Sequence, residues 1–147
     1  MVIAVALTAA AFGAPVADAK KRKKKKKVRT ATAVYDSPSL GSGDATGVCF
    51  GANGCAMFAI GPTERFISLK IEDTTGLPAY ATVGQDLDPS DQFTDVIGRF
   101  CGETEEPMAI EPGIEVVVWI WALPGAQPPC PGAATTGQVT AKISNLP

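Results

Sequence analysis

The sequence contains no histidine. This absence excludes Ser-His-Asp triads, Cys-His pairs and every zinc site that needs an imidazole ligand. For a serine or threonine nucleophile only assistance by lysine remains, and Lys70 and Lys142 fall at predicted outward strand positions, where a lowered pKa is not expected. Paired carboxylates could hydrolyse a glycosidic bond, but among the 14 acidic residues from 30 to 147 some pair falls at a suitable spacing by chance. We therefore expect a protein without enzymatic activity.

The sequence also has few charged residues, 19%, and no stretch outside the N-terminal segment with a clear helical pattern. It has instead 15 glycines and 12 prolines among 147 residues, which favours many short strands joined by turns. With 46% hydrophobic residues the chain can build one packed core, and its length suits a single domain.

The first segment lacks charge from residue 2 to residue 17 and ends in Ala17-Asp18-Ala19. Such an apolar run followed by an A-x-A site predicts a signal peptide, residues 1–19, cleaved after Ala19. Its basic n-region is missing, which a start codon placed too far downstream would explain. The alternative is an uncleaved membrane anchor, but the run is shorter than the ~20 residues that a spanning helix needs. We expect a secreted or extracytoplasmic protein with no transmembrane helix in its mature form.

An even number of cysteines follows this segment: Cys49, Cys55, Cys101 and Cys130. Behind a signal peptide, this number predicts two disulfides formed in an oxidising compartment. Three pairings are open, and the most local one, Cys49 with Cys55 and Cys101 with Cys130, is favoured. The alternative, a metal site of four thiolates, is disfavoured because no C-x-x-C pair exists.

Positive charge is concentrated in residues 20–29, where nine of ten residues are basic: Lys20, Lys21, Arg22, Lys23, Lys24, Lys25, Lys26, Lys27 and Arg29. The remainder, residues 30–147, holds four basic and 14 acidic residues, a net charge of −10. A block of like charges repels itself and has no apolar face to bury, which predicts a disordered polybasic segment over residues 20–30.

This polybasic segment has two interpretations. It is a solvated spacer that lies loosely on the acidic part of its own chain, or it binds an anionic surface of the cell envelope. Phospholipid headgroups, phosphate-bearing wall polymers and extracellular DNA are such surfaces, and each Lys or Arg near an anionic membrane contributes about 1 kcal/mol. No aromatic residue is interleaved with the basic ones, so specific nucleic-acid recognition is not expected.

Residues 31–147 show strand patterns. Ile67, Leu69 and Ile71 alternate with polar residues, which predicts a half-buried strand over residues 67–72. The longest apolar segment, residues 114–123, is rich in β-branched and aromatic residues, which favours a strand over a helix. Further candidate strands cover residues 32–35, 56–60, 79–83, 96–101, 107–110 and 138–144. We predict an all-β, antiparallel β-sandwich of about seven to nine short strands.

The order of elements from Phe58 to Ser144 resembles the bacterial pre-peptidase C-terminal domain. The matching pieces are the strand at residues 67–71, the turn and strand at residues 76–83, and the closing strand at residues 137–141. Residues 110–118 are similar to that family's "aG-Y-vrV" strand. The resemblance implies a secreted, jelly-roll-like sandwich and a noncatalytic exported module.

An acidic loop after residue 84 offers a candidate calcium site, formed by Asp86, Asp88, Asp91 and Asp95. Calcium takes six to eight oxygen ligands, of which such a loop could provide several. The loop is not an EF-hand, because Asp91 stands where that motif needs glycine. The alternative is a solvated acidic loop in an acidic protein. No other cofactor is expected.

Trp119 and Trp121 lie two residues apart on one predicted strand, so their rings point the same way, about 7 Å apart. An exposed pair of this kind would stack on sugar rings. The alternative is a packing role, which is favoured because the other face of the strand is wholly aliphatic. The sequence thus predicts an exported, noncatalytic module held on an anionic surface, with a carbohydrate- or calcium-dependent binding module as the alternative. It leaves the oligomeric state open.

Overall fold

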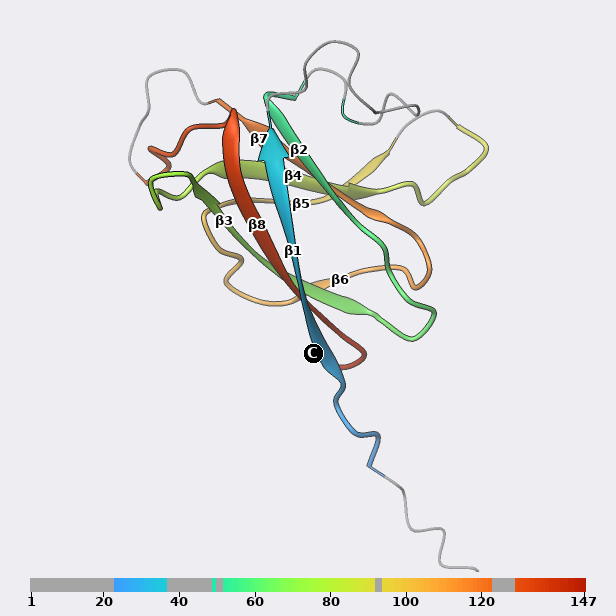
Figure 1. The fold of residues 1–147 in the computed structure, drawn as a ribbon. Helices are drawn as coiled ribbons and strands as arrows, with labels where there is room; N and C mark the ends of the chain where they lie inside the picture. The colour runs from blue at the N-terminus through green and yellow to red at the C-terminus, as the bar shows by residue number, and fades with distance from the viewer. Residues whose placement is uncertain (1–22, 37–48, 50–51, 92–93, 123–128) are drawn as a thin grey trace, which may run out of the picture.

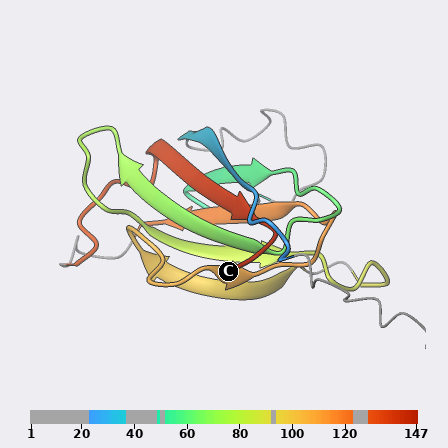
Figure 2. The same ribbon diagram turned by 90° about the horizontal axis from the view of Figure 1, so that it is seen from below.

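The computed structural model describes residues 23–36, 49, 52–91, 94–122 and 129–147. These residues form eight strands and no helix, arranged as two antiparallel sheets of four strands. Figure 2 shows the sheets as two stacked layers. No helix long and apolar enough to cross a membrane occurs in this described part of the chain.

Each sheet combines strands from both halves of the sequence. Sheet A has the order β1 (Val28–Asp36), β8 (Thr136–Ser144), β3 (Phe66–Asp73) and β6 (Met108–Ala109). Sheet B has the order β2 (Gly54–Phe58), β7 (Val116–Trp121), β4 (Tyr80–Gln85) and β5 (Asp95–Cys101). Figure 1 shows β1, β8 and β3 side by side in sheet A.

The pairing of the strands is nested. β1 pairs with β8, β2 with β7, β3 with β6 and β4 with β5, as in one long hairpin. The contacts of β3 with β8 and of β4 with β7 roll this hairpin into two sheets. This arrangement is a jelly roll. The predicted antiparallel, jelly-roll-like β-sandwich of seven to nine strands is confirmed.

The hydrophobic core lies between the two sheets. Ile67, Leu69 and Ile71 of β3 are at most 1% exposed, and Val116, Val118 and Ile120 of β7 belong to the same cluster. Successive side chains of a strand point to opposite faces, so the alternation in the sequence places every second residue in this core. The predicted buried face of residues 67–72 is confirmed.

β1 begins earlier than the sequence predicted. Val28, Arg29 and Thr30 pair with the last residues of β8, although the sequence placed them in the polybasic segment. β8 has nine residues and ends at Ser144, and β1 pairs with β8 along this whole length. The polybasic segment therefore ends at Lys27. The predicted signal peptide, residues 1–19, lies outside the described residues.

Both disulfides have the pairing favoured by the sequence, Cys49–Cys55 and Cys101–Cys130. The first closes a short loop at the start of β2, and the second joins the end of β5 to the segment before β8. Disulfides persist in oxidising compartments, so this pair of bonds indicates an extracytoplasmic location.

One polar side chain is completely buried at the end of β4. Gln85 is 0% exposed, and its amide nitrogen donates to the carbonyl oxygens of Glu111 (3.1 Å) and Ile114 (2.8 Å). Its amide oxygen accepts from the backbone nitrogen of Glu111 at 2.8 Å. Because buried polar groups are costly unless they are bonded, Gln85 fixes the connection between β6 and β7 on the core.

Candidate functional site

The basic arm, which we define as residues 20–27, precedes β1, and the structure describes its last five residues, Lys23 to Lys27. Lys23 to Lys27 are all exposed and extend from the end of sheet A at which β1 begins (Figure 1). Lys20, Lys21 and Arg22 lie outside the described residues. The predicted anion-binding residues are therefore contiguous with the first strand of the sandwich.

Asn145 fixes the main chain of the arm just before β1. Its side-chain oxygen accepts from the backbone nitrogen of Lys27 at 2.7 Å, and its side-chain nitrogen donates to the carbonyl oxygen of Lys25 at 3.2 Å. The backbone nitrogen of Asn145 donates to the Lys27 carbonyl oxygen at 3.4 Å, which continues the pairing of β1 with β8. The base of the arm thus has a defined position on the protein.

The ammonium groups of Lys23 to Lys27 form no ion pair with an aspartate or glutamate of the described residues. The ion pairs among the described residues are Arg29–Glu64 and Lys70–Glu72, and neither involves Lys23 to Lys27. Lys26 donates from Nζ to the main-chain oxygen of Pro147 at 2.7 Å. The ammonium groups of Lys23, Lys24, Lys25 and Lys27 are exposed and form no hydrogen bond or ion pair among the described residues, so they remain available to an external anion.

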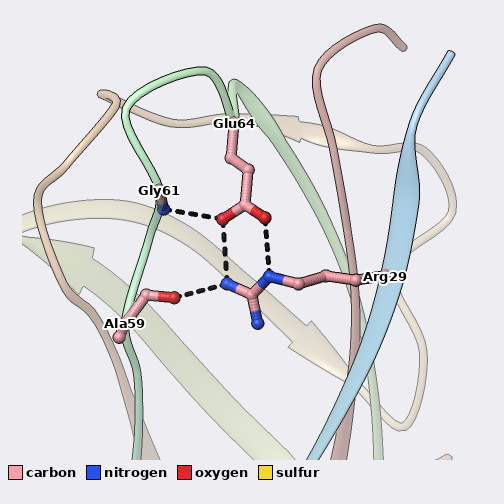
Figure 3. Close-up of polar contacts among 4 residues, drawn as sticks. All are labelled: Arg29, Ala59, Gly61 and Glu64. Carbon is pink, nitrogen blue, oxygen red and sulfur yellow. Dashed lines mark hydrogen bonds and ion pairs between the residues drawn. The ribbon is translucent and has the colours of Figure 1, made fainter.

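Arg29 has a different role from the lysines before it (Figure 3). Its guanidinium donates to both carboxylate oxygens of Glu64, at 2.6 and 2.8 Å, and to the carbonyl oxygen of Ala59 at 2.5 Å. Glu64 also accepts from the backbone nitrogen of Gly61 at 2.7 Å. The hydrogen bond from Arg29 lowers the pKa of Glu64, and the same bond raises the pKa of Arg29. Arg29 thus ties β1 to the β2–β3 loop.

Replacing Arg29 with glutamine is therefore expected to lower the free energy of unfolding by about 1 kcal/mol, since a fork-like pair at the surface is lost. Lys27→Gln removes the same charge two residues away and is expected to leave stability unchanged, because the side chain of Lys27 is exposed. Urea unfolding of both variants measures the difference. Equal effects of the two substitutions would mean that the contact with Glu64 stabilises nothing.

Two carboxylates of the acidic loop, Asp88 and Asp95, accept hydrogen bonds from residues of the same loop. Asp88 accepts at Oδ1 from the backbone nitrogen of Ser90 (2.9 Å) and from its hydroxyl (2.6 Å), and the hydroxyl bond lowers the pKa of Asp88. Asp95 accepts from the backbone nitrogen of Leu87 at 3.2 Å. Within the described residues, no three acidic, cysteine or histidine side chains lie together as a ligand set. The candidate ligands Asp86, Asp88, Asp91 and Asp95 thus remain a prediction from sequence, without geometric support.

The two tryptophans lie on the outer face of sheet B. Trp119 is 9% exposed and packs with Ala52 and Val117, so its packing role is confirmed. A Cβ atom at Gly84 would lie 2.7 Å from its ring, which shows how closely the ring covers the neighbouring strand. Trp121 is half-buried and donates from Nε1 to the hydroxyl oxygen of Thr82 at 3.1 Å. Sugar stacking by Trp119 and Trp121 stays a prediction from the sequence.

Two other titratable groups have strongly shifted pKa values, and both hold the segment after Cys130. Asp73 accepts hydrogen bonds from Thr75, Ala133 and Leu77, and these bonds lower its pKa to about 2. Burial raises the pKa of Tyr35 to about 12, and its hydroxyl donates to the Ala133 carbonyl oxygen at 3.1 Å. Their shifts are therefore explained by packing and hydrogen bonding within the fold.

A surface hollow of about 280 Å³ lies beside the Cys101–Cys130 disulfide. Charged side chains from β3 and the β5–β6 connection line it, namely Lys70, Glu72 and Glu103. Lys70 and Glu72 form an ion pair at 2.8 Å, and this bond raises the pKa of Lys70. Lys70 thus compensates one of the two carboxylates that line the hollow, and Glu103 leaves it with a net negative charge.

The fold defines the protein as an all-β, jelly-roll sandwich with two disulfides. No protein-family model and no curated protein matches the chain, so the resemblance to pre-peptidase C-terminal domains stays a prediction. Among solved structures, the chain is similar to the crystal structure of the Yersinia pseudotuberculosis-derived mitogen, with a TM-score of 0.40 and 10% sequence identity. The similarity covers 82% of this chain and 86% of that one. A similarity of this degree says nothing about what this chain binds.

Proposed function

We propose that this protein is an exported, noncatalytic β-sandwich module that its basic arm holds on an anionic surface of the cell envelope. The observation that supports this function best is the exposure of Lys23 to Lys27 and their lack of acidic partners in the described part of the chain. All five are exposed, and none forms an ion pair within the described residues, although residues 30–147 have a net charge of −10. This favours a surface anchor over a spacer that lies on its own acidic chain.

The energetics of the arm are those of a polyelectrolyte contact. Each basic residue near an anionic membrane contributes about 1 kcal/mol, and binding that releases counterions weakens steeply as salt rises. The hydrogen bonds of Asn145 with Lys25 and Lys27 fix where the arm leaves the sandwich. The bound module is therefore expected to have a preferred orientation, with the end of sheet A at which β1 begins nearest the surface.

The test replaces all eight basic residues of positions 20–27 with glutamine in the full chain and leaves Val28 and Arg29 unchanged, since both belong to β1. Co-sedimentation with isolated envelopes at 50 mM salt is expected to be lost in this variant. A matched control with arginine at every lysine of the arm keeps the charge and is expected to bind like the wild type. Binding of the glutamine variant at the wild-type level would refute the proposed anchor.

The noncatalytic part of the proposal rests on the absence of histidine and on the shifted titratable groups, whose hydrogen bonds and burial account for their pKa values. A carbohydrate- or calcium-dependent module, the alternative from sequence, has no specific observation in its favour. Trp119 is buried, and Asp88 and Asp95 bond within their own loop.

A further inference from the structure

The outer face of sheet A carries a lysine whose ammonium group has no polar partner in the described part of the chain. Lys142 of β8 is exposed, and its ammonium group forms no hydrogen bond or ion pair among the described residues. Its neighbours along the strand, Ala141 and Ile143, are buried in the core. Because residues of a strand alternate between faces, Lys142 projects away from the core over the outer surface of the sheet.

Two hydroxyl side chains flank Lys142 on the adjacent strands. The register places Thr30 of β1 opposite Lys142 on one side and Ser68 of β3 opposite it on the other. Neighbouring strands lie about 4.8 Å apart, so these three side chains form a straight row across the sheet. Thr30 is exposed and Ser68 is partly exposed. An ammonium group between two hydroxyl donors can bind the oxygens of one phosphate.

The charge around Lys142 also favours an anion. The carboxylates near this face, Glu72 and Glu103, lie beside Lys70 of β3: Lys70 forms an ion pair with Glu72 at 2.8 Å, and Glu103 pairs with Lys70 on the side of β3 that faces away from β8. Lys142 is therefore an uncompensated positive charge on a polar surface of an otherwise acidic domain. This surface is continuous with the basic arm, since β1 carries Thr30 and begins at Val28, directly after Lys27.

We propose that Thr30, Lys142 and Ser68 form a phosphate subsite for a linear, phosphodiester-linked envelope polymer that also contacts the basic arm. This subsite rests on the proposed function and specifies its ligand. A linear polymer suits the geometry because the row lies on the face of the sheet while the arm leaves from the end of the same strand, β1. A polymer with repeated phosphates can contact both the row of side chains and the basic arm.

The test measures binding of the full-length protein to poly(glycerol phosphate) over a salt series. Lys142→Gln is expected to weaken binding about fivefold, the effect of one basic contact. It is also expected to reduce the slope of log K against log salt by about 0.7 to 0.9, the value for one phosphate contact. Arg99→Gln, which removes an exposed charge from β5 in sheet B, is the matched control and is expected to change neither quantity.

The outcomes separate this subsite from the proposed anchor. If the glutamine arm variant loses binding while Lys142→Gln and Arg99→Gln behave alike, the subsite is wrong and the anchor stands. If the arm variant binds like the wild type, the anchor itself is wrong. If Lys142→Gln weakens binding to vesicles of phosphatidylglycerol and phosphatidylcholine but not to the polymer, the choice of a polymer is overturned. Matching unfolding curves for the two single variants ensure that stability does not cause the difference.

Discussion

Replacing Cys101 and Cys130 together with alanine is expected to lower the free energy of unfolding by about 3 to 4 kcal/mol. The bond spans a sequence separation of 29, and such a cross-link removes much of the conformational entropy of the unfolded chain. In the folded state it holds the segment before β8 against the end of β5. For a domain of this size, the melting temperature is expected to fall by roughly 10 to 15 °C.

The other disulfide provides the control for this substitution. Cys49 and Cys55 are separated by only six positions, so replacing both with alanine is expected to cost about 2 kcal/mol. Urea unfolding of the two double variants under non-reducing conditions compares the values. A larger loss for the Cys49–Cys55 pair would contradict the view that loop length determines the contribution of each bond.

Replacing Asp73 with alanine is expected to cost about 3 kcal/mol, because several hydrogen-bond donors lose a charged acceptor at once. Its carboxylate accepts from the backbone nitrogen and hydroxyl of Thr75 at 2.8 and 2.7 Å, from the Leu77 nitrogen at 3.0 Å and from the Ala133 nitrogen at 2.9 Å. Asp73 is 8% exposed, so water cannot easily replace it. It joins the β3–β4 turn to the segment that follows Cys130.

The pH dependence of the free energy of unfolding separates the contribution of the charge of Asp73 from the contribution of its shape. Its pKa is lowered in the folded protein from 3.8 to about 2, so the folded state favours the ionised carboxylate. The stabilisation is complete above about pH 4 and is lost as the pH falls towards 2. Asp73→Asn, which does not titrate, is expected to show a weaker loss over this range in chemical unfolding. Parallel curves for the wild type and the variant would show that Asp73 does not contribute by its charge.

The strands could be predicted from the sequence because each carries its own pattern. Ile67, Leu69 and Ile71 alternate with polar residues, and this alternation is a local property that burial of one sheet face requires. The turn after β3 is likewise a local feature, since Asp73 and Thr75 are typical turn residues and bond to each other. The local disulfide pairing followed from the spacing of the cysteines.

The contacts that define the base of the arm could not be predicted, because no local pattern encodes them. Arg29 and Glu64 are 35 residues apart, and Asn145 binds Lys27 over a separation of 118. Arg29 looks like one more member of a basic run until the register of β1 with β8 is known. Lys142 was recognised as outward-facing, but its two hydroxyl neighbours depend on strand order, which the sequence does not show.

The measurement that tests the central claim most directly is the binding of the full-length protein to isolated envelopes between 50 and 200 mM salt, for the wild type and the glutamine arm variant. The account predicts that the wild type binds at 50 mM salt, that its affinity falls at least 100-fold by 200 mM, and that the variant does not bind. Wild-type binding that is insensitive to salt, or equal binding of the variant, would contradict the proposal that the basic arm holds this module on an anionic surface.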